Sequence, residues 1–186
     1  MVAHSSDLIC IQEVGMRDGL QSAGQFVTTE DKVRLIDQLS KTGLSKIEVT
    51  SFVSPKAVPL LADAEEVLAA INRQPSVTYS ALIPNRRGLD RALAVELDEV
   101  NLVMSVSEAH NLANLRMTCE QSIEQFREIC NNRGSLRVNG TLATAFGCPF
   151  HGEVTQSTVF EWAHRYLDVG IDSLTLADTI GAATPR

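Results

Sequence analysis

The stretch EVGMRDGLQ, residues 13–21, follows a short apolar run at Leu8–Ile11 and precedes a predicted helix. An arginine and an aspartate, Arg17 and Asp18, therefore stand where a predicted strand ends. These residues alone admit two interpretations, a surface turn with two solvated charges or part of an active site. The bare tripeptide Arg17-Asp18-Gly19 favours the turn, and the rest of the chain is needed to test that interpretation.

The same order of segments recurs along the chain: an apolar, β-branched run, then a polar turn, then an amphipathic helical run. The predicted strands start 38, 32, 21, 37 and 36 residues apart. This is the spacing of βαβ units, and it predicts a parallel sheet. The predicted strands are Leu8–Glu13, Lys46–Thr50, Thr78–Leu82, Glu99–Met104, Leu136–Leu142 and Asp172–Leu176.

Capping residues mark the starts of the predicted helices between these strands. Thr28 or Thr29 is expected to cap the first helix, and Thr155 a later one. Thr118 and Gln121 have the spacing of a capping box. Two further helices are predicted at Asp63–Leu68 and Gly88–Leu97.

Six βα units fit either a doubly wound sheet or most of a (β/α)8 barrel, and the polar residues separate the two. A barrel builds its site from the carboxyl ends of all its strands, whereas a doubly wound sheet concentrates it at one switch point. Polar residues lie in or after every predicted strand here: Arg17, Asp18, Glu48, Ser51, Asn85, Ser105, Ser107, Glu108, Thr144 and Asp178. No GxGxxG turn is present. We therefore predict an α/β fold, a (β/α)8 TIM barrel, of which residues 1–186 supply about the first six βα units as a single, C-terminally incomplete domain.

Composition limits the classes of function. The chain has 186 residues, of which 44% are apolar, enough for one globular core. A formal net charge of −7 argues against non-specific nucleic-acid binding, which requires a basic surface. No apolar run approaches the ~18 residues that span a bilayer, and the first residues lack the pattern of a signal peptide. We expect a cytoplasmic protein with reduced cysteines and with neither a membrane nor a nucleic acid as partner.

Arg17, Asp18 and Glu48 have residue types that suit a metal-assisted reaction. Asp18 is a hard oxygen ligand for a divalent cation, and Arg17 can hold an anionic oxygen with several donors. Glu48 lies within an apolar strand. If its side chain points into the barrel it needs a positive partner, for which Arg17 is the natural candidate. The alternative is a Glu48 that faces outward near a helix.

Other candidates have an ordinary interpretation that competes with the functional one. Asp178 is either a site residue or a cap for the turn that follows it. Cys148 is favoured as a small buried apolar residue over a reactive thiol. His110 and His151 lie in predicted loops and are weaker candidates for substrate contact, since no histidine pair in the chain has metal-ligand spacing.

Four segments together resemble the hydroxymethylglutaryl-CoA (HMG-CoA) lyase family. They are EVGMRDGLQ, IEVTSFVSPKAVP (residues 47–59), AFGCPFHG (145–152) and LADTIGAATP (176–185), in the family's order and approximate spacing. The synthase branch of the same superfamily usually has DTTLRDGEQ at the first segment, so GMRDGLQ and SFVSPK favour the lyase branch. The agreement of four segments favours the interpretation of Arg17-Asp18-Gly19 as part of an active site over that of a solvated surface turn.

The resemblance implies a barrel enzyme that uses a divalent metal, Mg²⁺ or Mn²⁺. Its reaction would be the cleavage of HMG-CoA, or a related 3-hydroxyacyl-CoA, to acetyl-CoA and a keto acid such as acetoacetate. Asp18 is implied as a metal ligand, Arg17 as the group that stabilises the thioester enolate, and Glu48 as the carboxylate that orients Arg17. Asp178 matches a catalytic position after the sixth strand. The positions expected to contact the acyl-CoA substrate are Arg17, Gln21, Ser51, Ser107 and Thr144, and the protein is expected to be a homodimer.

The resemblance also implies residues that this sequence does not contain. In the family a His-x-His metal pair, a loop with a catalytic cysteine and an asparagine ligand follow the segment that ends at Arg186. We therefore expect an isolated 186-residue chain to be inactive. Two alternatives stay open: an acyl-CoA condensing synthase of the same superfamily, and a non-catalytic truncated barrel that binds an acyl-CoA.

Overall fold

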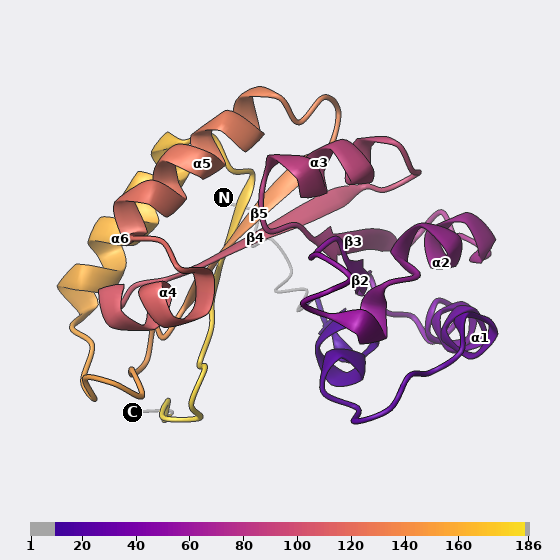
Figure 1. The fold of residues 1–186 in the computed structure, drawn as a ribbon, viewed down its shortest axis with the longest axis horizontal. Coiled ribbons are helices and arrows are strands. Elements are labelled where there is room, and N and C mark those ends of the chain that lie inside the picture. The colour runs from indigo at the N-terminus through magenta and orange to yellow at the C-terminus, as the bar shows by residue number, and fades with distance from the viewer. Residues whose placement is uncertain (1–9, 185–186) are drawn as a thin grey trace, which may run out of the picture.

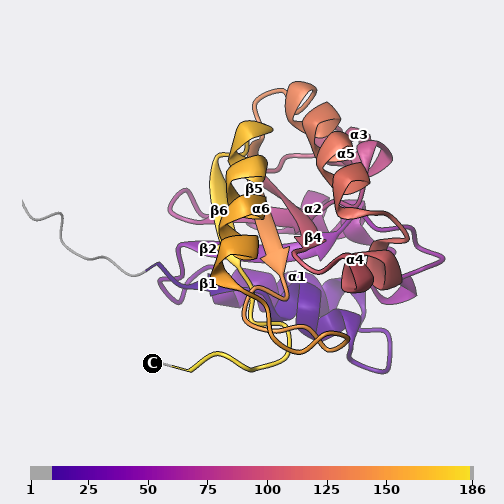
Figure 2. The ribbon, with the colours of Figure 1, turned by 90° about the vertical axis from the view of Figure 1, so that its left-hand side faces the viewer.

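The computed structural model describes residues 10–184, which form one parallel sheet with the strand order β1-β2-β3-β4-β5-β6. The sheet is curled, and the helices lie along its convex side (Figures 1 and 2). The strands are β1 (Gln12–Glu13), β2 (Lys46–Ser51), β3 (Thr78–Leu82), β4 (Glu99–Ser105), β5 (Arg137–Ala143) and β6 (Ser173–Leu176). The predicted parallel order of six βα units, as in the front of a (β/α)8 barrel, is confirmed.

Six α-helices and two single helical turns connect the strands of the described part of the chain. The helices are α1 (Thr29–Leu39), α2 (Ala64–Ala70), α3 (Arg86–Leu93), α4 (Glu108–Leu115), α5 (Cys119–Asn131) and α6 (Gln156–Asp168). The turns are η1, a π-helical turn at Gly15–Gly19, and η2, a 3₁₀ turn at Pro59–Leu61. Between residues 10 and 184, no helix has the length and apolar character needed to cross a membrane.

The predicted caps are present, but α2, α3 and α4 differ from the prediction. Thr28, Thr118 and Thr155 each accept a hydrogen bond from a backbone N–H in the first turn, and the capping box with Gln121 is complete. Helix α2 was predicted at Asp63–Leu68; it starts at Ala64, with Asp63 as the N-cap residue, and ends at Ala70. Helix α3 starts at Arg86, two residues earlier than predicted, because the Asn85 side chain caps it. It also ends earlier, at Leu93.

Helix α4 was not predicted at all. The sequence analysis placed His110 in a loop. The helix was missed because its buried face is short and polar. Among the eight residues of α4, only Asn111 is fully buried. The helix is instead defined by the Ser107 side chain, which accepts a hydrogen bond from the backbone N–H of His110 and caps the first turn.

The first predicted strand also needs a correction. The prediction placed it at Leu8–Glu13, but in the structure β1 covers only Gln12–Glu13. Leu8 and Ile9 lie outside the described residues. The chain turns immediately after β1 into η1, which uses the backbone carbonyl of Val14 as acceptor for the N–H groups of both Arg17 and Asp18.

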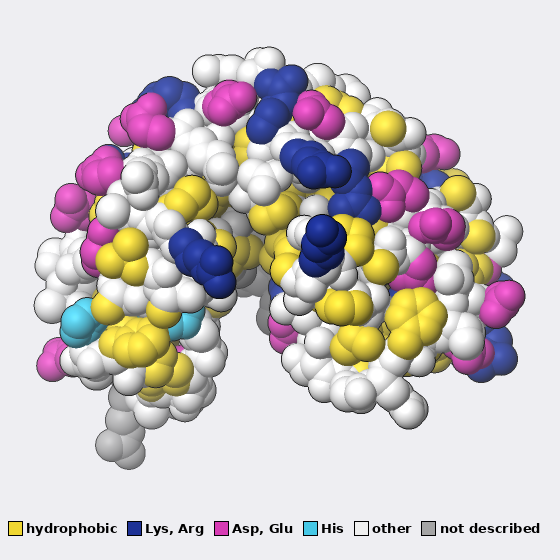
Figure 3. Space-filling model, in the orientation of Figure 1, with side chains coloured by type: hydrophobic (Ala, Val, Ile, Leu, Met, Phe, Trp, Pro, Cys, Tyr) yellow, Lys and Arg dark blue, Asp and Glu magenta, His cyan; other side chains and the backbone are white. Residues whose placement is uncertain are grey.

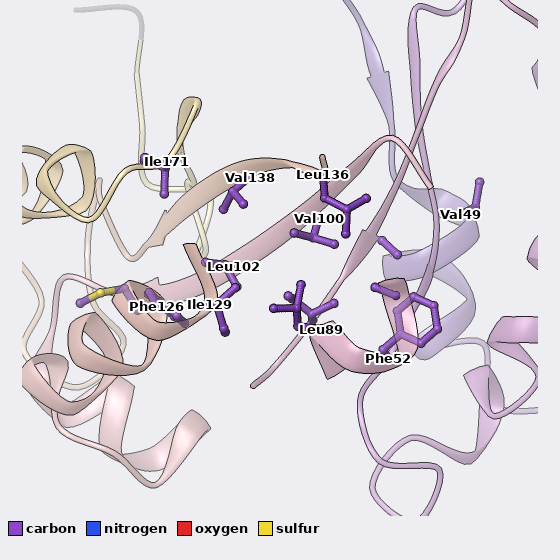
Figure 4. Packing of buried hydrophobic residues seen from close by; sticks show 14 of the residues in the cluster. Val49, Phe52, Leu89, Val100, Leu102, Phe126, Ile129, Leu136, Val138 and Ile171 are labelled. Atoms are coloured by element: carbon purple, nitrogen blue, oxygen red, sulfur yellow. The ribbon is translucent and has the colours of Figure 1, made fainter. Parts of the chain in front are cut away.

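The apolar core lies between the sheet and the helices. Alternate strand residues point to opposite faces, and those on the convex face are apolar and buried. Figure 4 shows Val100, Leu102 and Val138 on the strands near Leu89, Phe126 and Ile129 on α3 and α5. All six of these side chains are at most 1% exposed.

The concave face of the sheet carries polar residues instead. The buried polar side chains on this face include Glu48, Ser80, Asn101, Asn139 and Thr141. Barrel interiors are usually filled with branched apolar side chains, so the polar packing here sets the concave face apart from an ordinary barrel core. The molecule is visibly hollowed between its two halves on one side (Figure 3).

Gly140 lets α6 pack directly on β5. A Cβ at this position would lie 2.7 Å from two ring carbons of Tyr166 and 2.9 Å from the Ile171 side chain. The Tyr166 ring is fully buried and stacks on Phe126 with ring centroids 5.4 Å apart. Its hydroxyl donates to the Leu102 carbonyl at 3.2 Å, so the ring has little freedom to move aside.

Gly140→Ala is expected to lower the free energy of unfolding by about 1–3 kcal/mol, the usual effect of overpacking a filled core. Denaturant unfolding measures the change. Gly19→Ala is the control, because a Cβ at Gly19 would meet nothing within 4 Å. Equal stability of the two variants would contradict the close packing of α6 on β5.

Candidate active site

The turn η1 carries Arg17 into the concave side of the sheet. The Arg17 side chain is 16% exposed, whereas the Asp18 side chain is 67% exposed. Gly19, the last residue of η1, does not adopt a positive φ. The sharp change of direction comes from the π-helical turn, a geometry that is frequent at functional sites.

Glu48 points into the barrel, as one of its two interpretations required, and it is paired with Arg17. The Glu48 carboxylate is 1% exposed, and its Oε2 lies 3.2 Å from an Arg17 guanidinium nitrogen. The other terminal nitrogen of Arg17 donates to Asp18 Oδ1 at 2.8 Å. A buried carboxylate is stable only with such a partner, so this pair fixes η1 against β2.

A β-bulge in β2 brings Ser51 to the same face as Glu48. The register with β3 shifts between Glu48 and Thr50, so Glu48 lies beside Ser80 and Ser51 lies beside Leu82. Ser80 and Leu82 are two residues apart and share a face, and Glu48 and Ser51 therefore share it too, although three residues separate them. Ser51 is buried, and its Oγ accepts the backbone N–H of Val53 at 3.2 Å.

Ser107 and Cys148 form a contact between the loops that follow β4 and β5. The Cys148 thiol donates to Ser107 Oγ at 3.0 Å, and both residues are buried. Burial raises the pKa of the Cys148 thiol, but the hydrogen bonds with Ser107 and with the backbone of Phe150 and His151 have a larger combined effect, and the net pKa lies below the usual value. The predicted burial of Cys148 is confirmed.

Thr144, at the end of β5, has an uncommon backbone conformation. Its φ is 59° and it is fully buried, and a β-branched residue at positive φ is strained. Its backbone N–H donates to Thr179 Oγ1 at 2.7 Å. The loops after β5 and β6 are thus joined at the carboxyl end of the sheet.

The geometry at Asp178 is that of a cap for its own turn. Its two carboxylate oxygens accept the backbone N–H groups of Ala182 and Ala183, each at 2.9 Å. These bonds, with the one from Ala183 first, hold the pKa of the carboxyl below its usual value. A catalytic role for Asp178 remains a prediction. Gln21, the other outlying candidate, is exposed and lies two residues beyond the end of η1.

The structure therefore brings Arg17 into direct contact with both Asp18 and Glu48, and it places Ser51 on the same face of the sheet as Glu48. Ser107, Thr144 and Asp178 follow β4, β5 and β6 and lie at the same carboxyl end. Within residues 10–184 no group of three or more His, Cys, Asp or Glu side chains could hold a metal ion. The exposed carboxylate of Asp18 suits a hard cation, but the described residues do not complete a metal site.

Sequence reasoning named Ser105 and His110 but did not predict the contact between them. Ser105, at the end of β4, lies 2.5 Å through its Oγ from Nδ1 of His110, which belongs to α4 and not to a loop. Sequence reasoning missed Asn101 and Asn139, which lie deeper on the concave face. Their signal was available as polar residues spaced by two within the apolar strands β4 and β5.

Comparison with known proteins gives a consistent result. The model of the HMGL-like family matches residues 9–186. A hydroxymethylglutaryl-CoA lyase of Bacillus subtilis is 44% identical over 179 residues, which are 95% of this chain and 60% of the relative. The cytoplasmic 3-hydroxy-3-methylglutaryl-CoA lyase of Mus musculus is 40% identical over 181 residues, 96% of this chain and 53% of the relative.

Solved structures agree with the sequence relatives. An HMG-CoA lyase from Acinetobacter baumannii, in complex with coenzyme A and 3-methylmalate, matches with a TM-score of 0.93 and 50% identity. The match covers 100% of this chain and 61% of that one. The chain thus spans between about half and three fifths of the length of these relatives.

The strain at Thr144 predicts an unusual order of stability among variants. Thr144→Gly relieves the positive φ, whereas Thr144→Ala removes the same hydroxyl but keeps the strain. We expect the glycine variant to be the more stable of the two by about 1 kcal/mol, although glycine normally weakens a folded chain. Denaturant unfolding of both variants tests this, and a more stable alanine variant would show that the backbone at Thr144 is relaxed.

The capped turn after β6 is expected to depend on pH through Asp178. Because the folded-state pKa lies below the ordinary value, ionised Asp178 stabilises the turn at neutral pH, and this contribution is lost as the pH falls through the folded-state pKa. NMR chemical shifts of the Ala182 and Ala183 amides, followed during an acid titration, report the change. In Asp178→Asn the same two amides should show no such titration step.

Proposed function

Since the chain belongs to the HMGL-like family, we propose that the protein is a carbon–carbon lyase that cleaves a 3-hydroxyacyl-CoA thioester. The proposed substrate is HMG-CoA or a close relative, and the products are acetyl-CoA and a keto acid such as acetoacetate. The observation that carries the proposal is the ion pair between Glu48 and Arg17 at the mouth of the sheet. The coenzyme A and 3-methylmalate bound to the Acinetobacter baumannii relative support an acyl-CoA ligand.

Arg17 has the chemistry that the bond cleavage requires. When the tertiary hydroxyl loses its proton, its carbon becomes a ketone and the electron pair of the broken carbon–carbon bond passes to the thioester. The leaving fragment is an enolate, whose oxygen needs a fixed positive donor. A general acid must then protonate the enolate carbon to give acetyl-CoA. A guanidinium remains charged at any working pH, and its contact with buried Glu48 limits the directions in which Arg17 can point.

Asp18 is the proposed metal ligand among the described residues. A carboxylate oxygen suits Mg²⁺ or Mn²⁺, and Asp18 is exposed beside Arg17. A cation bound there would lower the pKa of the substrate hydroxyl. In this proposal Asp18 needs further ligands, and its present bond to Arg17 keeps the two opposite charges together.

The remaining candidates are assigned to positioning the substrate. Ser51, Ser107 and Thr144 line the carboxyl end of the strands, and Gln21 lies two residues beyond the end of η1. Asp178 is proposed to act through the turn that it caps, where Thr179 holds the end of β5. We further propose that the protein is cytoplasmic and that two copies of it form a homodimer.

The lyase assignment is tested with the full-length protein, HMG-CoA and Mg²⁺ or Mn²⁺. Acetyl-CoA release that depends on the added metal is expected. Arg17→Gln should lower kcat by about 10²–10³-fold, as expected when one donor to a developing oxyanion is removed. Asp18→Asn should instead raise the metal concentration needed for half-maximal rate.

Two other outcomes would redirect the assignment. Condensation of acetyl-CoA with a keto acid, without thioester cleavage, would indicate a synthase. Binding of coenzyme A without turnover at any metal concentration would indicate a non-catalytic barrel.

Lys41→Gln is the control for the loss of a positive charge in Arg17→Gln. Lys41 is an exposed residue just beyond α1, and its substitution should leave the rate unchanged.

A further inference from the structure

Asn101 connects the Arg17–Glu48 pair to the middle of the sheet. It lies on the central strand β4, is 6% exposed, and donates from Nδ2 to Glu48 Oε1 at 3.4 Å. Arg17 contacts the other carboxylate oxygen, Oε2. The two oxygens of Glu48 are therefore held from two directions, by the arginine of η1 and by the amide of β4.

The orientation of the Asn101 amide is fixed from its other side. Its Oδ1 accepts two hydrogen bonds, from Asn139 Nδ2 at 3.0 Å and from Thr141 Oγ1 at 2.9 Å. An amide oxygen has two lone pairs, so both are used. The Nδ2 group must then face Glu48, and a carboxylate that only accepts hydrogen bonds is the complementary partner.

Asn139 is oriented in the same way by the next strand. Its Oδ1 accepts from Ser173 Oγ at 2.8 Å and from Thr175 Oγ1 at 3.2 Å, both on β6. The direction of each amide thus depends on the one before it, from β6 through β5 and β4 to the carboxylate on β2. Ser173 and Thr175 are exposed, whereas Asn139, Asn101 and Glu48 are buried. The buried part of the network is rigid, because its members are held by hydrogen bonds in a region of low dielectric.

We propose that Asn101 is a positioning residue, which holds the Glu48 carboxylate so that Arg17 keeps one orientation at the mouth of the sheet. Asn101 touches neither the proposed substrate nor Arg17, and it acts through Glu48. The inference rests on the proposed function of Arg17 in the lyase reaction. Without the amide, Glu48 keeps its charge pair but loses the contact that fixes the rotation of its carboxylate.

The test compares the full-length protein with Asn101→Leu, which has similar volume and no amide. NMR signals of the Arg17 guanidinium, assigned with Arg17→Lys, report whether rotation about its Nε–Cζ bond is restricted. We expect separate signals for the two terminal nitrogens in the wild type and averaged signals in Asn101→Leu. We expect kcat to fall by about 10–100-fold, the usual effect of losing a partner that orients a reactive group, with KM little changed.

Asn111→Leu is the matched control for the loss of a buried amide. Asn111 is fully buried and bonds Ser105, Met117 and Ser122, away from Glu48. It should lower stability, as Asn101→Leu does, but leave the Arg17 signals unchanged. Averaged Arg17 signals in both variants would show a general loosening of the fold and would overturn the proposal.

Asn101→Asp supplies a conservative rescue. A protonated carboxyl at position 101 can donate to Glu48 as the amide does, whereas an ionised one repels it. The ratio of variant to wild-type kcat should therefore rise as the pH falls, and the restricted Arg17 signals should return. A ratio that does not change with pH, together with wild-type Arg17 signals in Asn101→Leu, would overturn the proposal. The NMR readout needs no turnover. If the wild-type protein cleaved no thioester but its Arg17 signals were separate, and those of Asn101→Leu were averaged, the lyase assignment would be refuted and the positioning role of Asn101 would stand.

Discussion

The burial of one carboxylate, that of Glu48, determines how the concave face of the sheet is built. An ionised group with almost no solvent contact requires a cation and further hydrogen bonds, because its desolvation is otherwise too unfavourable. Arg17 supplies the cation, and this contact ties η1 to β2. Asn101 supplies the further bond. The arrangement leaves Asp18 exposed beside Arg17. The two charged residues are therefore adjacent in sequence, but Arg17 is largely buried and Asp18 is accessible to solvent.

The two faces of the sheet have separate physical roles. The convex face and its helices bury the apolar side chains, where dispersion and the hydrophobic effect stabilise the fold. The concave face buries amides, hydroxyls and a carboxylate, which contribute little net stability but have fixed directions. Glycine at position 140 belongs to the first role, because only the absence of a Cβ allows Tyr166 to reach β5. Substitutions on the concave face are therefore expected to change the site more than the fold.

Much of the fold followed from local rules. The spacing of β-branched runs predicted six parallel strands, and Thr28, Thr118 and Thr155 marked helix starts correctly because caps act within one turn. Helix α4 was missed because its only fully buried residue is the polar Asn111. Charge balance indicated Arg17 as the partner of Glu48 if Glu48 pointed into the barrel, but it did not decide between the inward and the outward orientation. The Asn101–Asn139 contact could not, because it depends on which residues of β4 and β5 are level with each other.

The bulge in β2 changes which residues of the strand share a face of the sheet. Val49 is the additional residue, and it lets Glu48 and Ser51 share a face across an odd separation. In a regular strand of the same length, Ser51 would lie three residues from Glu48 on the opposite face and would point toward the helices. The bulge is thus as strict a requirement as composition. A relative with one residue fewer between positions 48 and 51 would keep both side chains on one face, but its strand would lack the bend and the added twist that a bulge introduces.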